Sequence, residues 1–379
     1  MDNINQKALE MHRKNRGKIE VKGKVPIENK DDLSLAYTPG VGHVSSEIGK
    51  NKELARELTL KGNSVAIVSD GSAILGLGNL GAEAAIPVME GKAALFKRFA
   101  DIDAFPICLS TQDAEEIIKT VKNIAPVFGG VNLEDISAPR CFEIERRLRE
   151  ELPIPVMHDD QHGTAVVVLA GVINSMKLAG LEKEKAKIVV SGAGAAGTAV
   201  AKIMLDYGFK DIVVLDSKGI INKERGDLSP DKKYLSETTN PRGISGGLAG
   251  AVKGADIFIG VSKPGILTGD MVRAMNARPV IFALANPVPE IMPDIAKEAG
   301  AFIVATGRSD FPNQVNNVLS FPGIFRGALD NGIKQFDDKM FIVAAEKLAA
   351  FVKNPSVDKI LPSVFEKGVT EAVAAAIKD

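Results

Sequence analysis

Short apolar runs alternate with polar or amphipathic segments throughout the second half of the chain. Val and Ile dominate these runs, as is typical of strands buried on both faces of a parallel sheet. The runs cover residues 187–191, 211–216, 256–260, 279–284 and 301–305. Helical patterns lie between them, such as the one that ends near Tyr207. Strands that alternate with helices predict an α/β fold with a doubly wound parallel sheet and right-handed crossovers.

In the first half of the chain, glycine-rich turns follow the apolar runs. The pattern predicts a strand over residues 64–69, a glycine-rich loop over 69–81 and a helix over about 88–99. Residues 164–178 are mostly apolar and are followed by Gly180, which predicts a buried helix with a glycine stop. We expect no apolar run to be long enough to span a bilayer.

Two further segments of the second half do not follow the alternation of strands and helices. Residues 218–240 are polar and turn-rich, which predicts an excursion over the surface rather than a core element. Residues 339–353 and 363–375 predict amphipathic helices, which we expect to pack back on the first part of the chain.

Composition and charge narrow the class of protein. The 379 residues include 47 Lys and Arg against 48 Asp and Glu, so no net field favours nucleic acid or a lipid surface. Cys108 and Cys141 show neither a disulfide framework nor the spacing of metal ligands. Residues 1–18 are polar and lack the apolar core of a signal peptide. These features predict a cytoplasmic protein that is long enough for two domains.

A glycine-rich motif lies between the strand predicted over residues 187–191 and the helix that follows it. Gly192, Gly194 and Gly197 form G-x-G-x-x-G directly after a strand and at the start of a helix. The first glycine permits the tight turn, the second lets the backbone approach a pyrophosphate, and the third brings the helix against the strand. Asp216 ends the next strand at the spacing expected for a ribose-binding acid. The pattern predicts a Rossmann-type domain.

The choice between NAD and NADP depends on two residues at the end of that strand. Asp216 should accept from the ribose 2′-hydroxyl and repel a 2′-phosphate, which favours NAD. Lys218 follows two residues later and could neutralise that phosphate. We expect NAD, and NADP stays open.

Acidic pairs follow two other predicted strands. Glu134 and Asp135 come after one strand, and Asp159 and Asp160 after another. Carboxylates at strand ends lie where α/β proteins build clefts, so these pairs can converge on one hard divalent cation, Mg²⁺ or Mn²⁺. Two flanking histidines lack a third nitrogen or sulfur ligand at zinc spacing. Any isolated acidic pair could instead cap a helix and face solvent.

Several segments, in order, resemble the malic enzymes of the short prokaryotic type. Ala36–Val41 resembles the tyrosine motif of that family, and Ile86–Lys92 resembles its catalytic-lysine segment. Its metal-binding segments are matched by Leu133–Asp135 and His158–Thr164. Its substrate-amide motifs are matched by Ala283–Pro287 and Val315–Val318. Several motifs in one order are more specific than any single one.

The resemblance implies a role for each matching residue. Tyr37 would be the general acid and Lys92 the general base, and Asp159 a neighbouring polar group rather than a ligand. The metal ligands would be Glu134, Asp135 and Asp160. Asn286 and Asn317 would bind a malate carboxylate. The cofactor contacts would come from Thr164, Gly192, Gly194, Ala195, Ala196, Gly197, Asp216 and Asn286.

The resemblance also implies an activity and an organisation. The activity is the oxidative decarboxylation of malate to pyruvate and carbon dioxide with reduction of NAD(P), in a homodimer. Residues 1–163 would form the catalytic domain, 164–328 the NAD(P)-binding domain and 329–379 a C-terminal helical segment. As the general base, Lys92 should have a depressed pKa. Ala73 stands where the larger animal enzymes have an arginine, which leaves open how the malate carboxylate is neutralised.

Two alternatives remain open. A malolactic-type enzyme would carry similar motifs, keep its NAD bound and release lactate. A dinucleotide-sensing protein without turnover would retain only the cofactor fold. The sequence also leaves open whether Tyr37 and Lys92 of one active site come from the same subunit.

Overall fold

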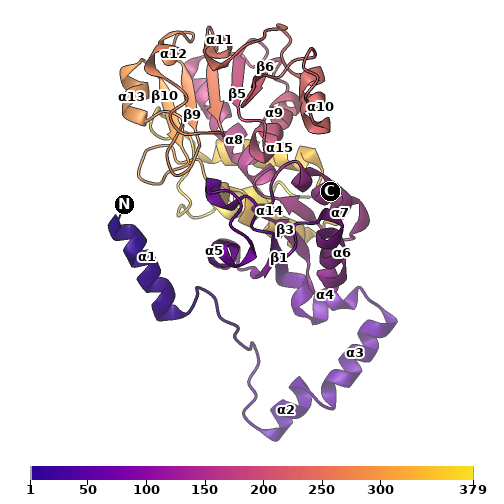
Figure 1. The fold of residues 1–379 in the computed structure, drawn as a ribbon. Helices are drawn as coiled ribbons and strands as arrows, with labels where there is room; N and C mark the ends of the chain where they lie inside the picture. Colours follow the sequence, from indigo (N-terminus) through magenta and orange to yellow (C-terminus); the bar gives the residue numbers. More distant parts are fainter. Residues whose placement is uncertain (1, 379) are drawn as a thin grey trace.

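Two parallel sheets organise the molecule in a computed structural model that describes residues 2–378. Figure 1 shows the larger sheet in the upper part of the molecule and the smaller one below it. The smaller sheet has four strands in the order β2-β1-β3-β4, all parallel. Their bounds are β1 Ser64–Ser69, β2 Asp103–Cys108, β3 Gly130–Leu133 and β4 Val156–His158. The predicted strand over residues 64–69 is thereby confirmed.

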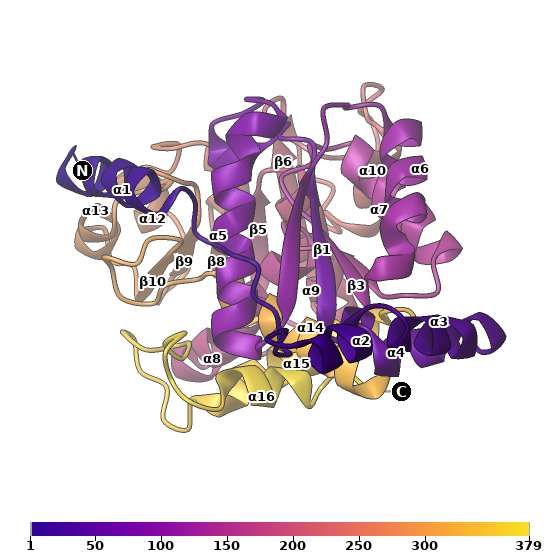
Figure 2. The same cartoon turned by 90° about the horizontal axis from the view of Figure 1, so that it is seen from below.

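Alternate side chains of β1 pack against helices on opposite faces of the small sheet. Val65 and Ile67 pack in the core that contains α5 (Ala82–Ala100). Ala66 and Val68 pack with α6 (Ala114–Ile124) and α7 (Arg140–Glu151). Figure 2 shows α5 on one side of β1 and these two helices on the other. Helix α5 begins earlier than the predicted residue 88, directly after Gly81, whose φ is 86°.

Helix α8 (His162–Ala179) runs through the middle of the fold and ends at Gly180, which has the left-handed φ of 71°. It packs against α9 (Ala195–Tyr207) and α15 (Asp338–Phe351). By length and composition this helix could cross a membrane, so the expectation that no apolar run is long enough was wrong. Its apolar side chains are mostly buried inside the protein, which explains its composition.

The larger sheet has six strands in the order β10-β9-β8-β5-β6-β7. Five pair in parallel, at positions close to the predicted runs, and β7 pairs antiparallel with β6. Their bounds are β5 Lys187–Ser191, β6 Asp211–Asp216, β7 Gly219–Ile220, β8 Ile257–Gly260, β9 Val280–Ala283 and β10 Ile303–Thr306. The helices around it include α11 Leu248–Val252, α12 Gly269–Arg273 and α13 Pro293–Glu298.

The segment after β6 differs from its prediction. It contains β7 and a helix, α10 (Pro230–Thr238), and the side chains of Ile220 and Leu235 are buried. These apolar residues are too widely spaced to stand out in a polar segment, so residues 218–240 were wrongly taken as surface only.

The C-terminal helices join the two parts of the fold. α14 (Phe321–Asn331) contacts α5, whereas α15 packs on α8. α16 (Val369–Ala374) packs on α14 and α15. The two helices expected to pack on the first part of the chain contact chiefly α8, α9 and α14 instead, and the contact with α5 is made by α14, which begins before the expected segment. The domain boundaries at residues 163 and 328 stay a prediction, and α14 runs across the second one.

The first four helices are α1 (Asp2–Asn15), α2 (Lys30–Ala36), α3 (Gly40–Lys50) and α4 (Leu54–Leu58). Figure 1 shows the first three standing outside the body of the molecule. No residue of α2 or α3 is buried, although both carry exposed apolar side chains such as Leu35 and Val41. We call residues 4–50 the N-terminal arm.

Candidate active site

Lys92 is the centre of a buried polar cluster at the junction of helix α5 and the small sheet. Its side chain is only 5% exposed. Its Nζ lies 2.9 Å from the Glu134 carboxylate, also contacts Asp159, and is 4.1 Å from the centre of the Phe321 ring. The buried residues of α5 recur at helical spacing, so one face of this helix is turned to the core. Lys92 lies on that face.

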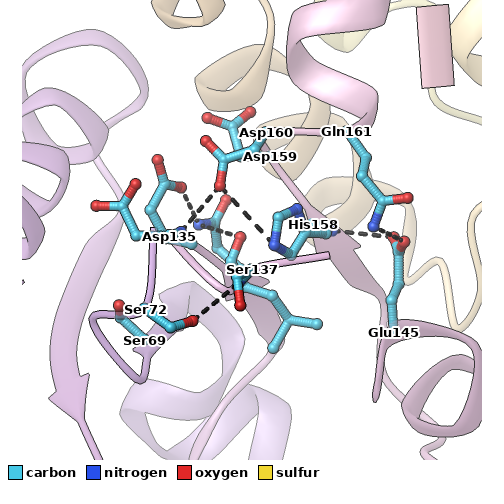
Figure 3. Close-up of polar contacts among 12 residues, drawn as sticks. Ser69, Ser72, Asp135, Ser137, Glu145, His158, Asp159, Asp160 and Gln161 are labelled. Carbon is cyan, nitrogen blue, oxygen red and sulfur yellow. Dashed lines mark hydrogen bonds and ion pairs between the residues drawn. The ribbon is translucent and has the colours of Figure 1, made fainter. Parts of the chain in front are cut away.

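The acidic residues converge from the ends of two neighbouring strands. Glu134 and Asp135 follow β3, and Asp159 and Asp160 follow β4, which pairs with β3. The backbone N–H of Asp135 donates to Asp160 Oδ2 at 2.9 Å. Asp135 has a φ of 53°, a left-handed conformation that an aspartate tolerates better than most residues. Figure 3 shows Asp135, Asp159 and Asp160 beyond these strand ends, with His158 beside them.

The crowding of carboxylates changes how they titrate. Burial raises the pKa of Asp135 to about 8, and the charges of Asp160 and Glu134 add to this rise. Burial also raises the pKa of Asp159 to about 7 and that of Asp160 to about 6. Beside the one lysine, the four carboxyl groups therefore do not all ionise easily unless a further cation is present.

The predicted direction of the Lys92 pKa was wrong for this geometry. Burial by itself lowers that pKa, but the Asp159 and Glu134 carboxylates outweigh it and hold the ammonium protonated. The sequence could not show this pairing, because the three residues come from separate elements.

The donor set fits a hard divalent cation. Among residues 2–378, no three His, Cys, Asp or Glu side chains stand in the geometry of a formed metal site. Yet Asp135 Oδ2 and Asp159 Oδ1 are buried and have no hydrogen-bond partner, and the surrounding ligand atoms are carboxylate oxygens. Such oxygens suit Mg²⁺ or Mn²⁺. Glu134, Asp135 and Asp160 are the residues that would hold it.

A second polar layer supports the acidic segment from behind, and the sequence analysis missed it. Glu145 on α7 is buried and accepts from the backbone N–H of His158 and from Gln161 Nε2, each at 2.9 Å. Its carboxylate also lies 2.9 Å from His162 Nε2. Burial alone would raise the pKa of Glu145, but His162 and these donors lower it to about 2. Figure 3 shows Glu145 and Gln161 on the far side of His158.

The predicted substrate amides have different positions. Asn317, at the start of a short 3₁₀ turn (Asn317–Leu319), donates from Nδ2 to Asp159 Oδ2 at 2.5 Å and so belongs to the Lys92 cluster. Asn286 is exposed after β9. A Cβ at Gly76, whose φ is 74°, would lie 2.8 Å from the Asn286 backbone oxygen, so this glycine lets the two parts of the fold approach each other.

Tyr37 is not brought into this cluster by its own chain. It ends α2 in the N-terminal arm, and its side chain is 66% exposed. Figure 1 shows α2 and α3 well away from α5, which carries Lys92.

The glycine-rich turn after β5 opens on a large cavity. A Cβ at Gly192, where φ is 117°, would lie 2.5 Å from the Val261 oxygen, and one at Gly197 would lie 1.7 Å from the Gly192 oxygen. A Cβ at Gly194 would meet no atom within 4 Å, because this residue faces open space. Gly192 and Gly194 line a cavity of about 980 Å³.

Of the other expected cofactor contacts, Asp216 alone is among the residues that line this cavity. Ala195 and Ala196 form the first turn of α9, and Thr164 lies in the first turn of α8, where its N–H donates to the Asp159 carbonyl. Lys218, which was expected to be able to neutralise a 2′-phosphate, lines the cavity and pairs with Asp227, whereas Arg225 and Lys232 bind Asp216. Its role toward a 2′-phosphate stays a prediction.

A doubly wound sheet with a glycine-rich phosphate turn, joined to a buried lysine–carboxylate cluster, defines a two-domain dinucleotide-dependent oxidoreductase. Two family models match the chain: "Malic enzyme, N-terminal domain" over residues 16–149 and "Malic enzyme, NAD binding domain" over residues 161–379. The chain belongs to the malic enzyme family, as its motifs predicted.

Relatives and solved structures agree with this assignment. The chain is 53% identical to the bifunctional malic/malolactic enzyme of Bacillus subtilis, over 99% of this chain and 92% of that protein. It is 52% identical to the NAD-dependent malic enzyme of Geobacillus stearothermophilus, over 99% of this chain and 78% of that one. The crystal structure of the NAD-dependent malic enzyme from Thermotoga maritima covers 98% of both chains at 51% identity and a TM-score of 0.95. NADP-dependent malic enzymes are also among the relatives. The predicted fold class is confirmed.

Proposed function

We propose that this protein oxidises malate with NAD(P) and decarboxylates it to pyruvate and carbon dioxide. The observation that carries this proposal is the buried cluster in which Lys92 lies between Glu134 and Asp159, in a chain that also has a glycine-rich dinucleotide turn. Ala138 and Pro139, which follow closely after Asp135 in the chain, line the cavity at that turn. The same segment therefore connects the cavity with the acidic cluster.

The residues of the cluster divide the chemistry between them. A divalent cation held by Glu134, Asp135 and Asp160 would supply Lewis-acid chemistry at the hydroxyl and ketone oxygen of the substrate. Lys92 Nζ accepts the hydroxyl proton. If Glu134 turned its carboxylate to such a cation, Lys92 would keep only Asp159 as a carboxylate partner, and its pKa would fall toward the value a base needs. Asn317 stands beside Lys92 through Asp159 and can bind a substrate carboxylate.

We propose NAD as a cofactor, because an acidic residue, Asp216, ends β6 inside the cavity, as in sites that bind the ribose of NAD. Relatives that use NAD and relatives that use NADP support the broader assignment to NAD(P).

We further propose a homodimer in which the N-terminal arm of one copy lies on the other. In this arm, α2 and α3 have no buried residue, and the side chains of Leu35, Tyr37 and Val41 are exposed. Apolar surface of this kind is stabilised by a partner. Tyr37, the residue that would protonate the enol, would then act in the site that contains Lys92 of the second copy. The free Cys108 and Cys141 support a reducing, cytoplasmic location.

The test is a turnover assay of the purified protein with malate, Mn²⁺ and either NAD or NADP, with identification of the product. Metal-dependent reduction of the nicotinamide together with pyruvate is the expected result. The name of the Bacillus subtilis relative makes malolactic activity the second candidate, and lactate without net reduction of the cofactor would establish it. Binding of the dinucleotide without any turnover would refute both and leave the sensor alternative.

A further inference from the structure

The carboxylate of Asp216 is enclosed by donors from the segment that follows β6. Arg225 Nη1 donates to Oδ1 at 2.8 Å and Nη2 to Oδ2 at 3.0 Å, so the pair is bidentate. Lys232 Nζ donates to Oδ2 at 2.6 Å, and the Lys218 backbone N–H donates to Oδ1 at 2.9 Å. The Asp216 side chain is only 6% exposed.

These contacts use most of the acceptor capacity of Asp216. A carboxylate offers about four acceptor sites, and four donor atoms already occupy them. Although burial would raise the pKa of Asp216, Arg225 and Lys232 hold it well below its usual range. Asp216 is therefore a neutralised anchor for two cations rather than a free acceptor that repels a phosphate.

Arg225 is also held from its other side. Its Nε and Nη2 donate to the two Asp227 oxygens, each at 2.9 Å. The Asp227 carboxylate keeps the guanidinium at the cavity rim even when a contact to Asp216 is broken. Arg225 and Lys232 both line the cavity that contains the glycine-rich turn.

We infer that Arg225 and Lys232 are specificity-determining residues that let this site accept the adenosine 2′-phosphate of NADP as well as the free ribose of NAD. The inference rests on the proposed function, since it takes this cavity as the dinucleotide site. Phosphate oxygens replace the Asp216 oxygens as acceptors for Arg225 and Lys232, and a guanidinium suits phosphate geometry well. With NAD, both cations stay on Asp216.

The experiment compares two adenosine fragments that differ only in the 2′-phosphate. Adenosine 2′,5′-bisphosphate and adenosine 5′-monophosphate are titrated into the full chain by calorimetry, without malate or metal. We expect the bisphosphate to bind wild type roughly tenfold more tightly or better. In Arg225→Gln the difference should shrink to less than about threefold, with little change for the monophosphate. Lys232→Gln should move the ratio in the same direction.

Arg242→Gln is the matched control. Arg242 forms an ion pair with Asp211 at 3.0 Å in the same part of the fold and does not line the cavity, so this variant should keep the wild-type ratio. Equal binding of the two fragments by wild type, or a ratio that survives in both Arg225→Gln and Lys232→Gln, would overturn the inference. Malate turnover is measured separately. A protein that shows the fragment preference but oxidises no malate with either cofactor would refute the proposed function and leave the specificity assignment standing.

Discussion

Lys92 and Glu134 form a buried ion pair with 2.9 Å between Nζ and Oε1. One of these residues is the candidate base and the other a candidate metal ligand, so we expect the proton affinity of Lys92 to fall when a cation binds Glu134. A buried lysine between two carboxylates stays charged. Withdrawal of one carboxylate toward a cation is the simplest way to lower its pKa.

The first prediction concerns Lys92 itself. Lys92→Ala should reduce kcat by a factor of about 100 or more, because general-base catalysis commonly contributes 10²–10⁴-fold. Binding of the dinucleotide, followed by fluorescence of the reduced cofactor, should stay within about twofold of wild type, since the glycine-rich turn lies on the other sheet. Lys97→Ala on the same helix is the control, because Lys97 is half-exposed and pairs with Asp101 and Asp103. Near-normal turnover of the Lys92 variant would remove it from the mechanism.

The second prediction tests where Tyr37 acts. Tyr37→Phe and Lys92→Ala should each be inactive in pyruvate formation when alone. If each site combines residues of two copies, mixing the variants after reversible dissociation should restore about a quarter of wild-type activity, because half of the dimers are mixed and each has one intact site. Activity no greater than the sum of the separate variants would place both residues in one chain.

A companion measurement separates the two half-reactions of Tyr37→Phe. Reduction of oxaloacetate needs no proton at the terminal carbon, so it should be impaired less than pyruvate formation from malate. Equal loss in both assays would contradict the role of a general acid at the enol.

The third prediction concerns Asp135 as a metal ligand. Asp135→Asn keeps the shape of the side chain and removes its charge. The Mn²⁺ concentration for half-maximal activity should rise by a factor of about ten or more, as expected when a ligand or its close support is lost. Asp101→Asn, at an exposed position on the end of α5, should leave the titration unchanged. A Mn²⁺ titration that does not move in Asp135→Asn would exclude Asp135 from the site.

The fourth prediction follows from the raised pKa values of the acidic cluster. Burial and neighbouring carboxylates raise the pKa of Asp135 to about 8 and that of Asp160 to about 6. Ionising them in the folded protein is unfavourable, so with a chelator present the free energy of unfolding should fall as pH rises from about 4 to 8. A cation binds the ionised form, so Mg²⁺ should raise Tm more at pH 8 than at pH 6.

Calorimetric scans at both pH values, with and without Mg²⁺, measure this difference. The Asp135→Asn variant should show a smaller Mg²⁺ effect and a flatter pH dependence. If Mg²⁺ stabilised the protein equally at the two pH values, Asp135 and Asp160 would not be the groups whose ionisation controls binding of the cation.

Local patterns in the sequence determined most of the fold. The strands over residues 64–69 and 211–216 and the glycine stop at Gly180 match the structure, because each depends on neighbouring residues only. The glycine-rich turn was also readable, since its three glycines have steric causes within one strand, turn and helix. The buried side chains of β7 and α10 were not, because their apolar residues are sparse and find their partners at a distance.

Tertiary structure alone decided the charges of the site. Lys92, Glu134 and Asp159 come from a helix and two strand ends, and only their meeting in a buried place makes Lys92 a held cation. In the same way, Asp216 is neutralised by Arg225 and Lys232, which no spacing rule connects to it. Sequence patterns report local conformation and residue chemistry. Proton affinity and charge compensation depend on which groups burial brings within a few ångströms, and that is a property of the folded chain.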